Sequence, residues 1–447
     1  MQIVIIGAGP AGLFLGSALA RRGHQVTAVD RDPGPADDAT WARRGVMQFH
    51  HAHAFRQTVV EALGRELPET LELWQAAGAE AIEFEDFGGA TMQLGLRSRR
   101  ETFERCLRTA ATATPGFTLH HGHVERVIER HGRAAGVVVD GLPVTADLVV
   151  DASGRAGRAT RGLAERAGVC GPCGQAYVDR VYRLKSGAEP GPMTNPIAWQ
   201  ADLDGYLSLV FRHERGMFSV LVVRRSDDSG LRALRHPVAF EAAARAIPGL
   251  DVWTDPERAE PVTDVLAGGA LLNVYRSQCD ANGELVLPGL FFVGDSVATT
   301  TPVFGRGITT TLWQCEALLS LLDHDAADLV GTGHAFDAWS ADTMKPWVDD
   351  HIHMDAVRVH RWNGSDIDVE APLPSDLILT AAEVRPEIMQ HAGGYLSMAA
   401  LPASLRGAEP MARDVYAGGW RPSYAPGPTR DELVEIVGDA LREPQPV

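Results

Sequence analysis

The chain has 447 residues, of which 45% are hydrophobic and 22% charged, and its formal net charge is −17. This length is enough to bury two cores, and the acidic balance argues against nucleic acid or an anionic membrane as a partner. No apolar run is long enough to span a bilayer, and the apolar N-terminus lacks the basic start of a signal peptide. Because five is an odd number of cysteines for a disulfide framework, we expect reduced thiols and a cytoplasmic location.

The first thirty residues predict a strand–helix–strand unit that binds a dinucleotide. An apolar strand over residues 1–6 enters a Gly-x-Gly-x-x-Gly turn, a helix follows to residue 23, and a second strand over residues 25–30 ends in a carboxylate. In such a turn the first glycine permits a tight bend, the second admits a pyrophosphate to the backbone, and the third brings the helix close to the strand. The helix N-terminus attracts the phosphates, and the terminal acid accepts hydrogen bonds from a ribose. The predicted contacts are Gly7, Gly9, Pro10, Ala11, Gly12, Asp30 and Arg31.

Two later segments also predict a buried strand that has an acidic residue at or just beyond its end. Residues 146–151 predict a buried strand that ends in Asp151 and is followed by Ala-Ser-Gly-Arg. Residues 287–293 predict another, which is followed by a Gly-Asp pair and by an amphipathic segment that begins near Ile308. Together with the first unit, these segments resemble the superfamily of FAD-dependent aromatic hydroxylases, whose best-known member is p-hydroxybenzoate hydroxylase. Geranylgeranyl reductases and flavin halogenases are relatives of that superfamily.

The resemblance implies FAD as the cofactor and a role for each matching residue. Asp295 would bind the ribityl chain. The backbone N–H groups of Gly307 and Ile308 would meet the flavin edge, where a helix N-terminus stabilises the charge of the reduced ring. An Arg-x-Gly-Val-x-Gln loop over residues 43–48 and a helix that starts at Arg100 resemble other cofactor contacts of the family. The remaining contacts that the resemblance implies are Arg43, Gln48, Val124, Asp151, Gly294, Pro302 and Gly305.

The expected fold class is α/β, with a Rossmann-like FAD-binding domain, an inserted antiparallel β-sheet substrate domain and a mainly helical C-terminal extension. The expected boundaries place the FAD-binding domain at 1–174 and 271–325, the substrate domain at 175–270 and the extension at 326–447. Within the FAD-binding domain, residues 49–77 predict a helical stretch.

Alternation of apolar residues identifies the inserted sheet. It predicts four strands, over 176–183, 197–203, 206–211 and 217–223. A helix over 237–247 is expected behind them, and residues 84–92 predict a loop-rich segment of the FAD-binding domain. One face of the sheet is expected to lie toward the flavin.

A histidine-rich segment lies beside the expected flavin loop. We predict His51 and His53 as catalytic residues, because imidazole titrates near neutrality and can take a proton from a substrate. The competing interpretation is that one histidine bonds to FAD or to the backbone, while the others pack or face solvent.

Two further clusters have structural explanations. The segment 349–355 (Asp-Asp-His-Ile-His-Met-Asp) resembles a metal site, but only His351 and Asp355 would share a helix face, so we expect a solvated face and no metal. Cys170 and Cys173 form a Cys-x-x-Cys pair. Since a strand rather than a helix follows them, we expect a loop with two ordinary thiols rather than a redox pair.

The resemblance implies a monooxygenase. NADPH or NADH, docking without a domain of its own, would reduce FAD, and a flavin C4a-hydroperoxide formed with O₂ would hydroxylate or epoxidise a small aromatic or alkene substrate. The alternative is an FAD-dependent reductase or dehydrogenase of carbon–carbon double bonds, and a third possibility is a flavin-binding protein without catalysis. Halogenation is not expected, because neither Lys185 nor Lys345 lies in the context of the halogenase lysine and Trp199 lacks the rest of the halogenase motif. The expected partner is a small organic molecule such as a secondary metabolite; a homodimer and a separate flavin reductase both stay open.

Overall fold

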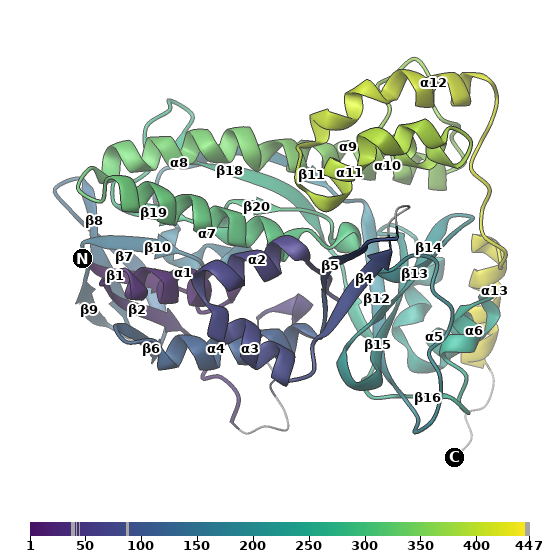
Figure 1. Ribbon diagram of the computed structural model, residues 1–447, viewed down its shortest axis with the longest axis horizontal. Coiled ribbons are helices and arrows are strands. Elements are labelled where there is room, and N and C mark those ends of the chain that lie inside the picture. The colour runs from purple at the N-terminus through teal and green to yellow at the C-terminus, as the bar shows by residue number, and fades with distance from the viewer. Residues whose placement is uncertain (37–40, 42, 44, 86–88, 443–447) are drawn as a thin grey trace.

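A computed structural model describes residues 1–36, 41, 43, 45–85 and 89–442. Its centre is a five-stranded parallel sheet in the order β19–β10–β1–β2–β6 (Figure 1). Parallel neighbours need crossover connections, and α1 makes the first of them, between β1 and β2. The strands are β1 (Gln2–Ile6), β2 (Gln25–Asp30), β6 (Phe117–His121), β10 (Leu148–Asp151) and β19 (Leu290–Phe292).

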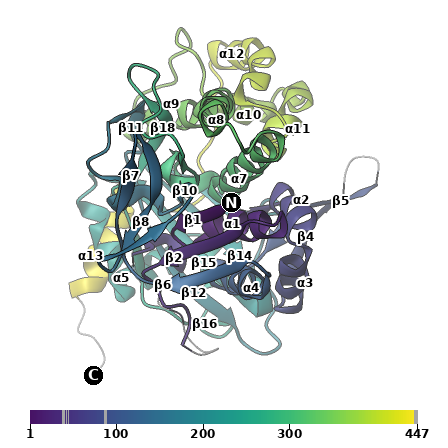
Figure 2. The same ribbon diagram turned by 90° about the vertical axis from the view of Figure 1, so that its left-hand side faces the viewer.

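The two faces of this sheet are covered differently. Alternation along β1 turns Ile3 and Ile5 toward a core of helices, and Val4 and Ile6 toward a small antiparallel sheet. Figure 2 shows α1 and α4 on one side of the parallel strands and β7 and β8 on the other. The covering helices are α1 (Pro10–Arg21), α2 (Gln57–Glu66), α3 (Pro68–Ala76), α4 (Arg100–Ala113), α7 (Gly307–His324) and α8 (Leu329–Thr343). The small sheet consists of β7 (Val124–Arg130), β8 (Arg133–Val139) and β9 (Leu142–Thr145).

An antiparallel sheet lies beside this domain, as expected for the substrate domain. Its order is β13–β14–β15–β12–β16, with β17 also paired to β12. Apolar side chains on one face, among them Val178 and Val222, pack against α5. The fold class predicted from the sequence is therefore confirmed. The elements are β12 (Gln175–Leu184), β13 (Ala198–Leu203), β14 (Tyr206–Arg212), β15 (Met217–Arg225), β16 (Ala259–Pro261), β17 (Leu266–Gly268), α5 (Pro237–Ala246) and α6 (Leu250–Trp253).

The C-terminal extension is helical, and it packs around Trp347, Tyr395 and Tyr416. It lies against a three-stranded sheet in the order β11–β18–β20. The last helix leaves the extension and packs on α5 through Leu433 and Val437, as the yellow ribbon of Figure 1 shows. The elements are β11 (Arg166–Pro172), β18 (Leu272–Asp280), β20 (Ala298–Thr299), α9 (Lys345–Trp362), α10 (Ser375–Thr380), α11 (Met389–Ser397), α12 (Glu409–Ala417) and α13 (Arg430–Arg442).

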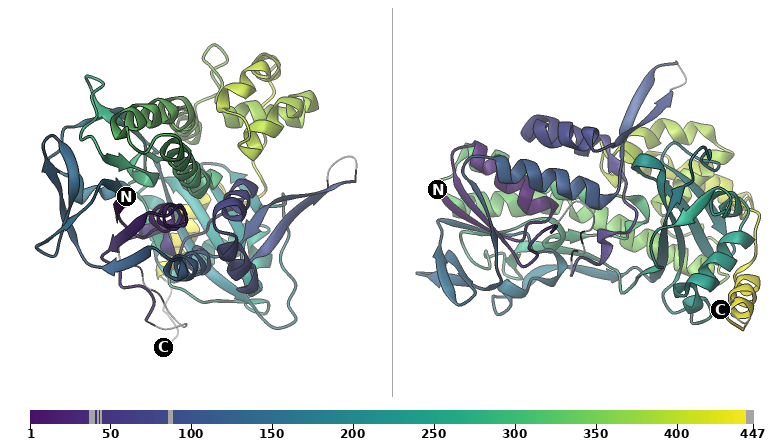
Figure 3. Two further views of the ribbon diagram at one scale, coloured as in Figure 1. Left: turned by 60° about the vertical axis from the view of Figure 1, so that its left-hand side comes forward. Right: turned by 90° about the horizontal axis from the view of Figure 1, so that it is seen from below.

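Several local predictions were wrong. The helical stretch predicted over 49–77 begins only at α2, because the residues before it form a 3₁₀ turn, an irregular loop and β3 (Phe55–Arg56). The segment predicted as loop-rich belongs to a hairpin of β4 (Glu80–Glu85) and β5 (Thr91–Arg97), whose strands project from the body in Figure 3. Cys170 lies within β11 rather than in a loop. In the part of the chain that the structure describes, no helix has both the length and the apolar character needed to cross a membrane.

Candidate functional site

A cavity of about 620 Å³ lies where the parallel strands end and the antiparallel sheet begins. This volume is within the range of small-molecule and cofactor sites, and the carboxyl ends of parallel strands are where such sites form. Gly12 and Asp151 are the two predicted site residues that do not line it. Those that do are Gly7, Gly9, Pro10, Ala11, Asp30, Arg31, Arg43, Gln48, His51, His53, Arg100, Val124, Gly294, Asp295, Pro302, Gly305, Gly307 and Ile308.

The glycine-rich turn forms one wall of the cavity, with the N-terminus of α1 directed into it. Gly7 has φ of 101°, and a β-carbon there would lie 2.7 Å from the carbonyl oxygen of Ala152. Gly12 lies behind the wall, where a β-carbon would come within 1.9 Å of the carbonyl oxygen of Gly7. The turn is therefore closed to side chains at both positions, and a phosphate in the cavity would meet the N-terminus of α1.

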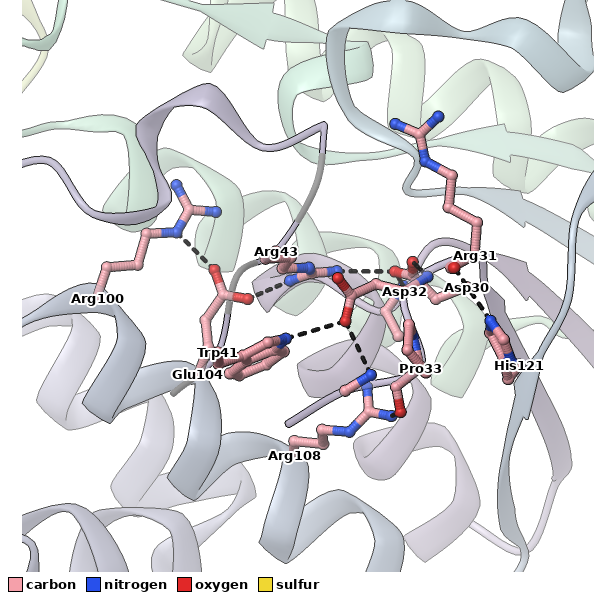
Figure 4. A network of polar contacts seen from close by, with 12 residues as sticks. Asp30, Arg31, Asp32, Pro33, Trp41, Arg43, Arg100, Glu104, Arg108 and His121 are labelled. Carbon is pink, nitrogen blue, oxygen red and sulfur yellow. Dashed lines mark hydrogen bonds and ion pairs between the residues drawn. The ribbon is translucent and has the colours of Figure 1, made fainter. Parts of the chain in front are cut away.

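The acid at the end of β2 is held in a charged network. The Asp30 carboxylate accepts hydrogen bonds from the Ala8 N–H at 2.7 Å and from the Arg43 guanidinium at 2.7 Å. Arg43 also pairs with the fully buried Glu104, which in turn accepts from Arg100 Nε at 2.5 Å. Figure 4 shows Arg43 between the two carboxylates. The alternating charges balance, so the buried arginines keep their orientation toward the cavity.

Asp151 has a different position. Its side chain is fully buried, and one oxygen accepts hydrogen bonds from the backbone N–H of Ser153 at 2.9 Å and from its hydroxyl at 2.6 Å. The other oxygen accepts from Thr160 Oγ1 at 3.0 Å. The carboxylate thus shapes the turn after β10, whose next residues, from Ala152 onward, line the cavity.

The far wall carries a second acceptor and a second helix N-terminus. Asp295 faces the cavity, and among the described residues only Gln48 Nε2 approaches its carboxylate, at 3.5 Å. Burial raises the pKa of Asp295, because few donors compensate the loss of water. Gly307 begins α7, so the first N–H groups of this helix also reach the cavity. Two acceptor carboxylates and two helix N-termini fit a cofactor with hydroxyl groups, a diphosphate and an electron-accepting ring, as FAD has.

The two predicted catalytic histidines have different environments. The His51 ring is buried at the cavity wall, and its Nδ1 lies 3.3 Å from Oδ2 of Asp179, which also accepts the N–H of Ala52 at 2.9 Å. His53 is engaged at both nitrogens, since Nδ1 lies 2.9 Å from the His51 carbonyl oxygen and Nε2 lies 3.3 Å from Arg100. Burial, together with Arg100, lowers the pKa of His53 well below its ordinary value. His51 is therefore the better placed of the two to accept a proton.

Asp179 was missed by sequence reasoning. It lies within β12 among apolar residues and is fully buried, and its Oδ1 has no hydrogen-bond partner in the described part of the chain. The available signal was an acid in the middle of a predicted apolar strand, because such a group is costly unless it has a function or a partner.

An apolar wall continues from His51 along the antiparallel sheet. The ring of Tyr177 meets the His51 ring edge-on at 4.9 Å between centroids. Leu209 of β14 and Leu221 and Val223 of β15 extend this surface. The cavity therefore has a polar half at the glycine-rich turn and an apolar half at the antiparallel sheet.

Four further arginines line the cavity and were not predicted, and one of them, Arg306, pairs with Asp350 at 3.4 Å. Arg155 and Arg158 follow β10, and Arg276 lies on β18. No ion pair joins their side chains to any residue that the structure describes. In a chain with a net charge of −17, this local excess of positive charge favours an anionic ligand.

The remaining two clusters lie outside the cavity lining. The solvated face expected for His351 and Asp355 was wrong, because both side chains are fully buried. No group of histidine, cysteine and acidic side chains within the described ranges is arranged to hold a metal ion. All five cysteines are free, and burial raises the pKa of Cys173 to about 12, so this thiol lacks the thiolate character of a redox pair.

Comparisons with known proteins agree with this geometry. The family described as FAD dependent oxidoreductase matches residues 2–169. The chain is 43% identical over 51 residues to D-amino acid dehydrogenase 2 of Ralstonia nicotianae, a match that covers 11% of this chain and 12% of that protein. It is 30% identical over 138 residues to D-amino acid dehydrogenase of Dechloromonas aromatica, which is 30% of each chain. The chain thus spans less than a third of the length of these curated relatives.

Solved structures resemble the whole fold. The flavin-dependent brominase Bmp2 superposes with a TM-score of 0.63 at 16% identity, over 94% of this chain and 100% of that one. PqsL of Pseudomonas aeruginosa, described as a probable FAD-dependent monooxygenase, has a TM-score of 0.57 at 16% identity, over 82% and 100%. The match to the FAD dependent oxidoreductase family thus lies in the N-terminal part of the chain, and the likeness to Bmp2 and PqsL is a likeness of fold.

Proposed function

We propose that the protein is an FAD-dependent monooxygenase that uses NAD(P)H and O₂ to hydroxylate or epoxidise a small aromatic or alkene substrate. The observation that carries this proposal is the His51–Asp179 pair, which lies between the polar half of the cavity and the apolar wall. FAD, when bound, supplies hydride acceptance and oxygen activation. The chain supplies a cavity that excludes water and a histidine that accepts a proton from the substrate.

Each part of the chain has a defined task in this proposal. The apolar wall of Tyr177, Leu209 and Leu221 excludes water from the substrate. Asp179 fixes His51 with its proton on Nδ1, which leaves the Nε2 lone pair to accept a proton from a substrate hydroxyl. The N-terminus of α7 at Gly307 places positive potential at the flavin edge.

The arginines at the cavity support direct reduction by a nicotinamide nucleotide. Arg155, Arg158 and Arg276 could meet the diphosphate of NADPH or NADH during transient docking. A separate flavin reductase is the alternative electron source. We also propose a cytoplasmic enzyme that acts on a secondary metabolite, and homodimer formation stays open.

The positions of the two lysines argue against halogenation. Lys185 Nζ bonds to the Pro256 carbonyl oxygen at 2.6 Å, and Lys345 Nζ bonds to Asp349 at 2.6 Å. Both lysines lie outside the cavity lining. The likeness to the brominase is therefore a likeness of fold, and the lysine that the halogenases of this superfamily use has no counterpart in the cavity.

Anaerobic reduction followed by oxygen-isotope labelling tests the proposal. The FAD-loaded protein is mixed with NADPH or NADH without oxygen, and bleaching of the flavin is followed. It is then supplied with ¹⁸O₂ and a panel of phenols, N-heteroaromatics and alkenes. One ¹⁸O atom in a product supports the monooxygenase. Saturation of an alkene under anaerobic conditions would instead establish the reductase, and no turnover of any kind would favour a flavin-binding protein without catalysis.

A further inference from the structure

A carboxylate of the C-terminal extension lies at the junction of three structural units. Asp355 of α9 is fully buried and accepts hydrogen bonds from Gln175 Nε2 and Asn273 Nδ2, each at 2.7 Å. It also accepts from the hydroxyl of Thr301, whose N–H bonds to Asn273 Oδ1 at 2.7 Å. One side chain thereby joins the extension to the first residue of β12, to β18 and to the loop that precedes α7.

The same helix holds the other end of that loop. Arg306, just before the first residue of α7, is 2% exposed, and its guanidinium lies 3.0 Å from Nε2 of His351. The rings of Trp347 and Tyr395 flank the guanidinium, with centroids 4.5 Å and 4.6 Å from its central carbon. Burial lowers the pKa of His351 well below its ordinary value, so the ring is neutral and can accept from the arginine. The loop 301–306 is therefore bound at both ends by the extension.

Both connections lead to the cavity. The loop includes Pro302 and Gly305, which line the cavity, and it sets the position of the α7 N-terminus. Gln175, Tyr177 and Asp179 alternate along β12 and so share one face of the strand. The bond from Asp355 to Gln175 thus fixes the face that carries the partner of His51.

We propose that the C-terminal extension is part of the flavin site, and that Asp355 is the positioning residue that sets the flavin-side loop and the substrate strand relative to each other. The inference rests on FAD binding in the cavity but not on the oxygen chemistry proposed above. An extension that only stabilised the fold, as a buttress, would need no more than apolar contacts with the sheet. The structure has instead a buried carboxylate with three donors, from β12, from β18 and from the loop that precedes α7.

Two substitutions test the proposal by the properties of bound flavin, without oxygen or substrate. Asp355→Asn removes the charge and places an amide against two amide donors, so we expect the dissociation constant of FAD to rise at least about tenfold. Thr301→Val removes one donor without changing charge. It should raise the constant by a smaller factor and shift the midpoint potential of bound flavin to a more negative value, because the α7 N-terminus is then less well placed.

The matched control is Asp349→Asn, which lies on the same helix but is exposed and, among the residues that the structure describes, pairs only with Lys345. It should leave FAD affinity, flavin absorption and midpoint potential unchanged. Binding is measured by fluorescence titration of apoprotein with FAD at a temperature where all variants are folded. If both test variants bind FAD with wild-type affinity and potential while only Tm falls, the extension is a buttress and the proposal is overturned. Wild-type protein that binds no FAD would overturn the FAD site and this inference together.

Discussion

Replacement of Asp179 by asparagine should weaken the base without disturbing flavin reduction. Asp179 and the His51 ring are 0% and 6% exposed, so solvent screens their interaction little. Asp179 Oδ2 accepts the Ala52 N–H and faces Nδ1 of His51, whereas Oδ1 has no partner among the described residues. In the variant, the asparagine carbonyl oxygen can take the place of Oδ2 and keep both contacts, so the His51 tautomer is retained. The variant loses the negative charge that stabilises the protonated imidazole during proton transfer.

A positioned base contributes about 10²–10⁴ in rate, which sets the upper limit of the effect. The rate of oxygen transfer to a phenolic substrate found in the ¹⁸O₂ screen should fall at least about tenfold, while the rate of anaerobic bleaching by NADPH stays at the wild-type value. NMR of ¹⁵N-histidine-labelled protein should show that His51 keeps its tautomer. The control is Asp227→Asn, whose exposed carboxylate pairs with Arg225. A fall of less than about threefold in oxygen transfer would refute the assignment of His51 as the base.

Three further predictions use other parts of the structure. Burial lowers the pKa of the histidines at positions 53, 213 and 351, that of His213 to about 4 from 6.5. The unfolded chain therefore binds protons that the native state does not, and the free energy of unfolding should fall below pH 6.5 by about 1.4 kcal/mol per pH unit for each group. Urea titrations from pH 7 to 4.5 check this, and His213→Asn should remove one group's share of the slope. Arg276→Ala should raise the KM for NADPH at least about tenfold and weaken its salt dependence, whereas the exposed Arg245→Ala should do neither; equal effects of the two would contradict a docking role. Gly12→Ala would place a β-carbon 1.9 Å from a backbone carbonyl oxygen, so Tm and FAD affinity should both fall, while Gly64→Ala, in open space within α2, should leave FAD affinity unchanged and not lower Tm.

Most of the predicted cofactor contacts line one cavity, and those of the glycine-rich turn were predictable because they depend on local geometry. The glycine-rich turn and the end of β2 lie within thirty residues, and each glycine has a steric reason that a single strand–helix–strand unit already contains. The segment around Asp295 was predicted from its resemblance to the family. Two predicted residues do not line the cavity: Gly12 lies behind the turn, and Asp151 occupies the expected place at a strand end but turns its carboxylate into the next loop.

The pairing of His51 with Asp179, at the apolar half of the cavity, could not be predicted from the sequence. His51 and Asp179 are 128 positions apart, and no local pattern indicates that they meet. The interpretation of residues 349–355 failed for a related reason. Helical spacing correctly placed His351 and Asp355 on one face, but it does not tell whether that face meets solvent or a buried loop.

The register of β12 sets the positions of the C-terminal extension, the cavity wall and His51 relative to one another. Alternate residues of this strand bond to the extension through Gln175, line the cavity through Tyr177 and hold His51 through Asp179. The residues between them, such as Val178, pack on the opposite face against α5. Because a shift of one residue would exchange the two faces, the pairing of Asp179 with Leu221 of β15 fixes the chemistry as well as the sheet. Truncation of the Val178 side chain should therefore lower the free energy of unfolding and leave the His51 tautomer intact. Substitution of Gln175 or Asp179 on the other face should instead change the cavity with a smaller loss of stability.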